Sequence, residues 1–283
     1  MPDKLKRLSP GHFPELLREI PDPPSQLYLA GTLPPASHRL LAVVGSRALS
    51  SYGRQVCDYL LRGLKDQPIA IVSGLAYGAD AEAHRVALDI GLPCIAVPGS
   101  GLDPSVLYPR ANVRLAEHII ASGGALISEF EPLQRATDYT FPKRNRIMAG
   151  MSHATLVIEA KERSGTLITA RLVTEYNREL LVVPGSIFSE TSKGSHQFLK
   201  LGATAVTEPD DILRALRLEP ALASAPELTD TEKIIFEVLA EPLSRDALFD
   251  ALSLDVTEAQ VTLATMEIKG LIVEEMGVIR RAR

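Results

Sequence analysis

The residues best suited to chemistry in this sequence are cations that stand beside glycine turns or helix starts. Arg47 ends the run Leu-Leu-Ala-Val-Val-Gly-Ser-Arg at residues 40–47, directly after Gly45 and Ser46. A glycine turn between a strand and a helix presents backbone N–H groups to an anion, and a guanidinium group can contact phosphate through two parallel hydrogen bonds. This stretch therefore predicts a phosphate site at the end of a buried strand.

A second basic stretch, Phe-Pro-Lys-Arg-Asn-Arg at residues 141–146, stands where a helix is predicted to begin. Most charge runs are simply solvated helix faces. Here Pro142 favours a helix start, and the positive end of the helix dipole adds to the three cations. The rings of Tyr139 and Phe141 offer stacking faces for bases. These features together favour a binding function for the stretch.

Two further turns combine glycine with hydroxyl groups or a capping carboxylate. Residues 73–80 contain Gly74 and Gly78, with an aspartate placed to cap the next helix, and residues 164–169 contain Gly165 and Thr166. Such turns let a backbone approach a ligand closely. A tight turn chosen for packing and a simple Ser/Thr helix cap explain them equally well, so neither turn decides the function alone.

Motifs of the common nucleotide, hydrolase and metal sites are absent from the sequence. There is no GxGxxG fingerprint, no phosphate-binding GxxxxGK[ST] loop and no GxSxG elbow. The six histidines lack metal-ligand spacing. Glu129, Glu131 and Glu159 are scattered, which is more typical of capping or solvated groups than of paired acid–base carboxylates. We therefore predict no catalytic group, no metal and no cofactor.

The composition limits the classes of protein to which the chain can belong. Its 283 residues carry a formal net charge of −5, which argues against coating nucleic acid through overall positive charge. A local basic pocket remains compatible, because charges act over roughly 8–10 Å at physiological ionic strength. No apolar run approaches the roughly 18–20 residues of a membrane helix, and the two cysteines are isolated. We expect a cytoplasmic protein that does not enter a membrane.

Apolar runs rich in β-branched residues alternate with helical patterns from residue 40 onward. Repeated alternation with short connections predicts an α/β fold with a doubly wound, mostly parallel sheet. Ligands of such sheets bind beyond the carboxyl ends of the strands, where the turns described above stand. The sequence predicts strands at residues 40–44, 69–73, 94–97, 125–128, 155–158, 180–183 and 205–206. It predicts one helix that starts at residue 50, and further helices at residues 80–90, 108–121, 143–151, 166–177, 196–201 and 210–216.

The chain is expected to contain four segments. Residues 1–38 form a Pro-rich leader that lies extended on the main domain, residues 39–217 the Rossmann-like domain, and residues 218–227 an Ala/Pro-rich linker. Residues 228–283 combine three short helices and a hairpin, which is typical of a winged-helix domain. Its third helix carries Glu258 and Glu267 against Lys269, so it is too acidic for a DNA-reading helix and favours an accessory role.

The sequence resembles the DNA-processing protein A family (DprA, also called Smf) from about residue 26 to the C-terminus. The motifs that carry the resemblance are Val-Val-Gly-Ser-Arg (43–47), Ser-Gly-Leu-Ala-x-Gly-x-Asp followed by Ala-His (73–84), Gly-Leu-Asp (101–103), Tyr-Pro (108–109), Ser-Glu (128–129), Phe-Pro-x-Arg-Asn-Arg-Ile (141–147), Ser-Gly-Thr-Leu-Ile-Thr-Ala (164–170) and Val-Pro-Gly (183–185). These motifs are specific in combination.

The resemblance implies an extended Rossmann fold that binds single-stranded DNA without sequence specificity and forms a homodimer. It implies that the protein is not an enzyme but loads the RecA recombinase onto single strands during natural transformation or homologous recombination. The nucleic-acid-binding residues that the resemblance implies are Gly45, Ser46, Arg47, Gly74, Gly78, Lys143, Arg144, Asn145, Arg146, Gly165 and Thr166.

Three departures from the family pattern matter. Members often carry an N-terminal helical domain, and here only the short leader precedes the main domain. Tyr77 stands where the family pattern has arginine, so that one phosphate contact is lost or is exchanged for stacking. His196 stands where asparagine is usual, with no clear consequence.

Two other functions compete with single-strand binding. A nucleotide-binding phosphoribohydrolase of the lysine-decarboxylase-like Rossmann group would need Pro-Gly-Gly-x-Gly-Thr-x-x-Glu. This chain has only Pro-Gly-Ser-Gly at 98–101 and a separate Gly-Thr at 165–166, with Thr169 in place of the glutamate. A transcription regulator that reads DNA with its winged helix is disfavoured by the acidity of the third helix.

Overall fold

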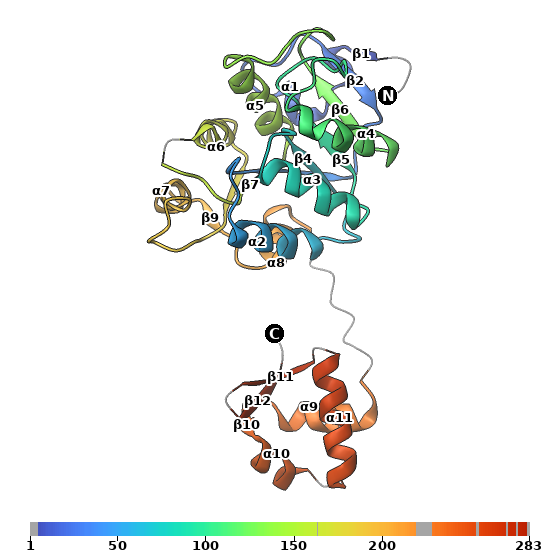
Figure 1. Cartoon of the computed structure of the whole chain (residues 1–283), viewed down its shortest axis with the longest axis vertical. Coiled ribbons are helices and arrows are strands. Elements are labelled where there is room, and N and C mark those ends of the chain that lie inside the picture. Colours follow the sequence, from blue (N-terminus) through green and yellow to red (C-terminus); the bar gives the residue numbers. More distant parts are fainter. Residues whose placement is uncertain are drawn as a thin grey trace. The chain divides into compact units, whose positions relative to one another are not determined.

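The computed structural model describes residues 5–162, 164–218, 228–252, 255–269, 271–275 and 277–281. The chain divides near residue 219 into a main unit and a C-terminal unit (Figure 1). The expected linker at 218–227 lies outside the described residues except for Leu218. In the part of the chain that the structure describes, no helix has the length and apolar character needed to cross a membrane.

The described residues of the main unit form one nine-stranded sheet. Its strands are β1 (Lys6–Leu8), β2 (Leu27–Gly31), β3 (Arg39–Val44), β4 (Ile69–Ser73), β5 (Cys94–Ala96), β6 (Ala125–Ser128), β7 (Ala154–Val157), β8 (Glu179–Val182) and β9 (Thr204–Ala205). The order across the sheet is β1-β2-β6-β5-β4-β3-β7-β8-β9, and β3 to β9 are mutually parallel. The chain therefore winds outward from β3 in one direction and then, from β7, in the other.

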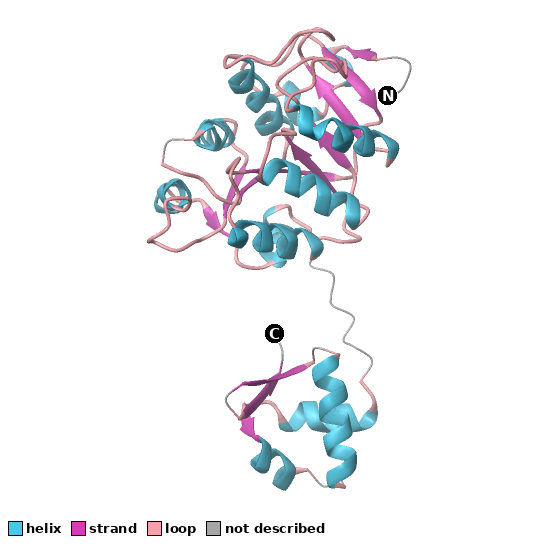
Figure 2. Ribbon diagram, viewed as in Figure 1, coloured by secondary structure: helices cyan, strands magenta, loops and turns pink. Residues whose placement is uncertain are grey.

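Helices cover both faces of this sheet (Figures 1 and 2). One face carries α2 (Ser51–Arg62), α3 (Ala79–Asp89), α4 (Val113–Ala121) and α8 (Pro209–Ala215), and the other carries α1 (Glu15–Arg18), α5 (Thr140–Met151), α6 (Gly165–Glu175) and α7 (Lys193–Lys200). Alternate residues of β3 enter opposite cores: Leu41 and Val43 face α2 and α3, whereas Leu40 and Val44 face α5 and α6. The expected α/β fold with a doubly wound, mostly parallel sheet is confirmed.

The N-terminal segment is more structured than an extended leader. β2 pairs antiparallel with β6, and β1 pairs antiparallel with β2, so both strands extend the sheet. The prolines do not prevent this, because Pro21, Pro23 and Pro24 precede β2 and Pro34 and Pro35 follow it. Leu17 of α1 is fully buried against the core beneath α5, which ties the segment to the main unit.

Helix starts differ most from the sequence prediction. α5 begins at Thr140 instead of residue 143, so Pro142 lies within its first turn, where the missing proline N–H has no hydrogen bond to lose. The helix expected at 108–121 begins only at Val113, after a short 3-10 helix, η2 (Arg110–Asn112). The other elements predicted from residue 40 to residue 216 agree with the structure to within about three residues.

The C-terminal unit is a winged-helix domain. It contains α9 (Asp230–Val238), β10 (Leu243–Ser244), α10 (Arg245–Ala251), α11 (Val256–Ile268), β11 (Ile272–Glu275) and β12 (Val278–Arg281), with a sheet in the order β10-β12-β11. The capping box of Thr229 and Glu232 is present at α9. The side chains of Thr257 and Glu258, and residues 270, 276, 282 and 283, lie outside the described residues.

Candidate functional site

A pocket of about 510 Å³ opens at the carboxyl ends of β3 and β7. These neighbouring strands mark the point where the winding direction of the sheet reverses, which is where open α/β sheets bind ligands. Seven of the predicted residues line it, joined by two polar residues that follow β7. The lining residues used below are Gly45, Ser46, Arg47, Asp80, Arg144, Asn145, Lys161, Ser164, Gly165 and Thr166.

The turn after β3 packs tightly against the turn after β4. A Cβ on Gly45 would lie 2.8 Å from the Cβ of Ala79, and a Cβ on Gly78 would overlap the backbone oxygen of Ser46. Gly78 also has φ +71°, a conformation that favours glycine. The Ala79 N–H donates to the Ser46 carbonyl at 3.1 Å. Gly78 therefore supports the pocket wall by close packing and does not itself line the pocket.

The amino end of α2, next to this turn, is already occupied by a carboxylate of the protein. Glu159, which follows β7 and is buried, accepts hydrogen bonds from the Ser50 N–H at 3.0 Å and the Ser50 hydroxyl at 2.6 Å. The Thr191 hydroxyl donates to the same side chain at 3.1 Å. The position where a glycine turn would hold a ligand phosphate is thus filled from within, and the capping role expected for Glu159 is observed.

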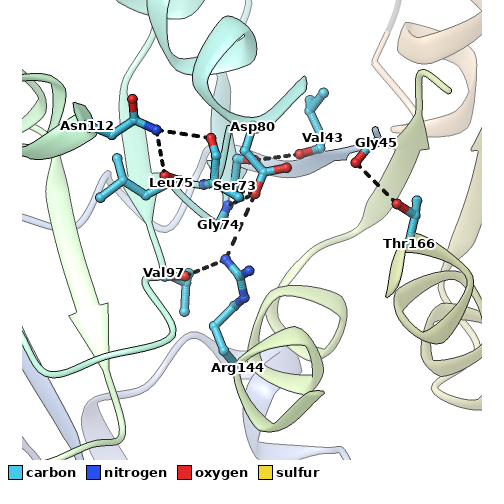
Figure 3. A network of polar contacts seen from close by, with 11 residues as sticks. Val43, Gly45, Ser73, Gly74, Leu75, Asp80, Val97, Asn112, Arg144 and Thr166 are labelled. Carbon is cyan, nitrogen blue, oxygen red and sulfur yellow. Dashed lines mark hydrogen bonds and ion pairs between the residues drawn. The ribbon is translucent and has the colours of Figure 1, made fainter. Parts of the chain in front are cut away.

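The turn after β4 is filled in the same way (Figure 3). One oxygen of the buried Asp80 accepts from the N–H groups of Gly74 and Ala76 at 3.1 and 3.3 Å. The amide nitrogen of Asn112 donates to the carbonyls of Leu75 and Ala76 at 2.9 and 3.1 Å. This turn is therefore rigid, and its N–H groups at Gly74 and Ala76 serve the fold rather than a ligand.

Arg144 forms the floor of the pocket. Its side chain is buried, donates to the Val97 carbonyl at 2.8 Å and lies 4.0 Å from Asp80 (Figure 3). Burial lowers the pKa of the Arg144 guanidinium and raises the pKa of the Asp80 carboxyl, and each partner opposes the shift of the other. A Cβ on Gly74 would overlap this guanidinium, so glycine at that position makes room for the buried cation.

The amino end of α6 forms the opposite wall, and no carboxylate of the described residues accepts a hydrogen bond there. Its first turn has no acidic residue, and the Thr166 hydroxyl donates to the Gly45 carbonyl at 3.2 Å, which joins α6 to the turn after β3. The hydroxyl oxygen of Ser164 is buried in the pocket wall without a hydrogen-bond partner among the described residues. The backbone N–H groups of Gly165 and Thr166 are therefore open to a ligand.

Two cations at the mouth of the pocket lie against aromatic rings. The exposed guanidinium of Arg47 lies 5.0 Å from the ring centroid of Phe141, and the ammonium of Lys143 lies 5.8 Å from that of Tyr139. Phe141 also packs against Tyr108, with ring centroids 6.0 Å apart. Cation–π contacts of this kind position the charges without neutralising them.

The expectation that residues 143–146 line one pocket is corrected for two of the four. Arg144 and Asn145 line the pocket, but Lys143 is exposed outside it. Arg146 points toward the N-terminal segment, where it forms an ion pair with Glu129 and donates to the Asp22 carbonyl. Successive residues on a helix are about 100° apart, so four in a row must face different directions.

Two residues that line the pocket after β7, Lys161 and Ser164, were not among the predicted contacts. A usable signal was present in the sequence, because both follow β7 at the edge where ligands of parallel sheets bind. Gly74 and Gly78 were predicted as backbone contacts to the ligand; neither lines this pocket, although Gly74 lines a small crevice that adjoins it.

A family model described as DNA recombination-mediator protein A matches residues 6–217, and the DprA winged helix domain matches residues 219–277. The chain belongs to the DprA family. Protein Smf of Escherichia coli is 42% identical over 205 residues, which cover 72% of this chain and 54% of that protein. DprA of Streptococcus pneumoniae is also 42% identical, over 71% of this chain and 70% of that protein. This chain therefore spans about half the length of the E. coli relative.

Two solved DprA structures share the fold. The structure from S. pneumoniae has a TM-score of 0.69 and 38% identity, and covers 75% of this chain and 74% of its own. The structure from Helicobacter pylori has a TM-score of 0.66 and 27% identity, with 76% and 96% coverage, and was solved to describe a single-stranded DNA binding mode.

Proposed function

We propose that this DprA-family protein binds single-stranded DNA without sequence specificity through the pocket between β3 and β7, and that it acts as a binder and not as an enzyme. The observation that carries the proposal is the contrast between helix amino ends at this edge. Protein carboxylates accept from the Ser50 N–H at the start of α2 and from two N–H groups in the turn before α3, whereas no protein carboxylate of the described residues accepts at the start of α6, which stands across the pocket from Arg47.

The charges around the pocket suit a polyanionic backbone although the chain as a whole is acidic. Arg47, Lys143 and Lys161 form no ion pair with other described residues, so each is available to a phosphate. Arg144 is held by Val97 and Asp80 and contributes a fixed positive field from the floor. Open amides and unpaired cations at one pocket are a general arrangement for phosphate contact.

The aromatic mouth favours single strands over duplexes. Bases of a single strand can stack on exposed rings, and every base has a face for such stacking, so little sequence preference results. The bases of a duplex are stacked on each other and are not free to do this. Phe141 and Tyr139 stand beside the cations, as a strand threaded past the pocket would require.

The remaining parts of the proposal draw on the family relation. We infer that the bound strand is delivered to RecA during transformation or recombination, that two copies of the chain form the active species, and that the protein works in the cytoplasm. The family's description as a recombination mediator supports the first of these points.

Fluorescence anisotropy with labelled oligo-dT and with a duplex of equal length tests the site. Wild type should prefer the single strand, and Arg47→Ala should weaken that binding by about three- to tenfold and reduce the slope of log affinity against log salt by about 0.7. Arg54→Ala, an exposed cation on α2 without an ion pair among the described residues, is the matched control and should behave as wild type. Equal binding of both DNAs, or equal effects of the two substitutions, would refute the site.

RecA delivery needs its own measurement. RecA filament growth on single strands coated with single-strand-binding protein should accelerate when the wild-type chain is added, and Arg47→Ala should reduce that acceleration. If the wild-type chain binds oligo-dT but leaves filament growth unchanged, the delivery role fails while the binding role stands.

A further inference from the structure

A narrow crevice continues from the phosphate pocket along the mouth. The crevice and the pocket share Arg47, Phe141 and Arg144 in their walls, and the crevice adds two rings, Tyr77 and Tyr108. A strand that lies in the pocket would therefore meet these rings next. Neither tyrosine contributes to the pocket itself.

The two rings are exposed without a structural task for their polar ends. Tyr77 and Tyr108 are 46% and 44% exposed, and neither hydroxyl has a hydrogen-bond partner among the described residues. Two other tyrosines of the main unit are held by their hydroxyls: Tyr28 donates to Glu131 and Tyr52 to the Pro184 carbonyl, both at 2.7 Å. Exposed rings beside a cationic pocket are what base stacking uses.

Hydrogen bonds hold in place the backbone segments that carry the two rings. Tyr77 belongs to the turn after β4, which Asp80 braces through two N–H groups. Tyr108 precedes η2, whose last residue, Asn112, donates two hydrogen bonds to the carbonyls of Leu75 and Ala76 in that same turn (Figure 3). Asn112 thus ties the two ring-bearing segments together, so little backbone entropy is lost there when a ligand binds.

We propose that Tyr77 and Tyr108 form a stacking ledge for the bases of a single strand whose phosphates occupy the pocket. The inference rests on the proposed function and adds its direction: the strand leaves α6, passes Arg47 and Phe141, and places its next bases on the two tyrosines. The contact of Phe141 with both Arg47 and Tyr108 links the phosphate pocket to the ledge. The ledge recognises base faces and is indifferent to base identity.

A tryptophan probe tests the ledge directly. The chain contains no tryptophan, so Tyr77→Trp places a single reporter on the ledge and Tyr59→Trp places one on α2, where Tyr59 is 57% exposed. Added oligo-dT should quench the emission of Tyr77→Trp and leave that of Tyr59→Trp unchanged. A strand of the same length with abasic sites should quench Tyr77→Trp far less. Equal quenching of the two variants, or equal quenching by the two strands, would overturn the proposal.

Affinity measurements separate stacking from charge. Tyr77→Ala combined with Tyr108→Ala should weaken oligo-dT binding by about thirtyfold or more, leave the salt slope unchanged and leave the affinity for the abasic strand unchanged. The paired Phe substitutions keep the rings and should bind as wild type, which also shows that the fold tolerates change at both positions. Undiminished oligo-dT binding by the Ala pair refutes the ledge.

The outcomes also separate this inference from the function on which it rests. If wild type does not bind single strands at all, the proposed function fails. If binding depends on Arg47 but not on the tyrosines, only the ledge fails. If the Ala pair instead changes the mass of the DNA-free protein in light scattering while its DNA affinity stays unchanged, the surface joins two copies and the ledge is refuted.

Discussion

Replacing Arg144 with methionine should destabilise the main unit by about 3–5 kcal/mol at neutral pH, because the substitution leaves Asp80 buried without its cation. Methionine keeps most of the apolar stem, so the loss comes from the charge and not from a cavity. The lost hydrogen bond to the Val97 carbonyl contributes roughly 1.5–3 kcal/mol. At 4.0 Å the attraction between the two charges is about 4 kcal/mol for an effective dielectric constant of about 20. The desolvation of Arg144 itself, which the variant avoids, offsets part of the sum.

The pH dependence of this cost has a definite sign. Burial raises the pKa of Asp80 in the folded chain, and Arg144 opposes that rise, so the variant should raise the pKa further. A carboxyl whose pKa is higher in the folded state is least costly when it is protonated. The destabilisation by Arg144→Met should therefore be largest near pH 7 and should shrink as the pH falls through the raised pKa of Asp80.

Urea unfolding followed by tyrosine fluorescence measures this effect in the full chain. All seven tyrosines precede residue 220, so their emission reports on the main unit alone. Arg144→Met combined with Asp80→Asn should cost less than the sum of the single changes, with a coupling of about 1–3 kcal/mol. A cost below about 1 kcal/mol, a cost that does not change with pH, or additive single changes would refute the idea that the two charges stabilise each other.

Three further predictions concern other buried groups. Burial lowers the pKa of His84 to about 4, so this group should reduce the free energy of unfolding by roughly 3 kcal/mol as the pH drops from about 6.5 to 4. His84→Gln should flatten this dependence of the unfolding free energy on pH. An unchanged pH dependence would exclude His84 as its cause. Arg146→Met should lower the free energy of unfolding in urea by about 3 kcal/mol, because Glu129 loses its partner. Its oligo-dT affinity, measured by anisotropy, should stay within about twofold of wild type. A loss of affinity as large as that of Arg47→Ala would show that Arg146 belongs to the binding site. Gly78→Ala should destabilise the main unit by at least about 2 kcal/mol and also weaken oligo-dT binding, since the turn after β3 must move. If the variant unfolds at the same urea concentration as wild type, the two turns are not packed as described.

The sequence was informative where burial on both faces of the sheet constrained it. Strands from β3 to β9 are short apolar runs between turn residues, and β4 and β6 were predicted at their observed bounds. β1 and β2 were missed, because the surrounding prolines suggested an extended path and β2 is antiparallel. Such a strand can be recognised only from its pairing with β6, about a hundred residues away.

The residues of the candidate site that follow strand ends were predictable from the sequence, but the arrangement of the side chains of α5 was not. Gly45, Arg47 and Gly165 follow strand ends, and parallel strand ends must meet at one edge. The burial of Arg144 was not predictable, because it depends on the space left by Gly74, seventy residues earlier. The helical phase of residues 143–146 likewise required the structure, since only packing decides which face of α5 points toward the pocket.

Glu159 has a consequence for how this fold can use phosphate at all. Dinucleotide-binding sheets bind a pyrophosphate at the turn after the first strand. In this chain the Glu159 carboxylate lies at the corresponding turn and accepts a hydrogen bond from the Ser50 N–H. A nucleotide that bound there would have to displace the Glu159 carboxylate, which is covalently part of the chain and therefore always present at the turn. A phosphate at that position would lie beside the Glu159 carboxylate, so the amino end of α6, after β7, is the more favourable place for the polyanion of the proposed function.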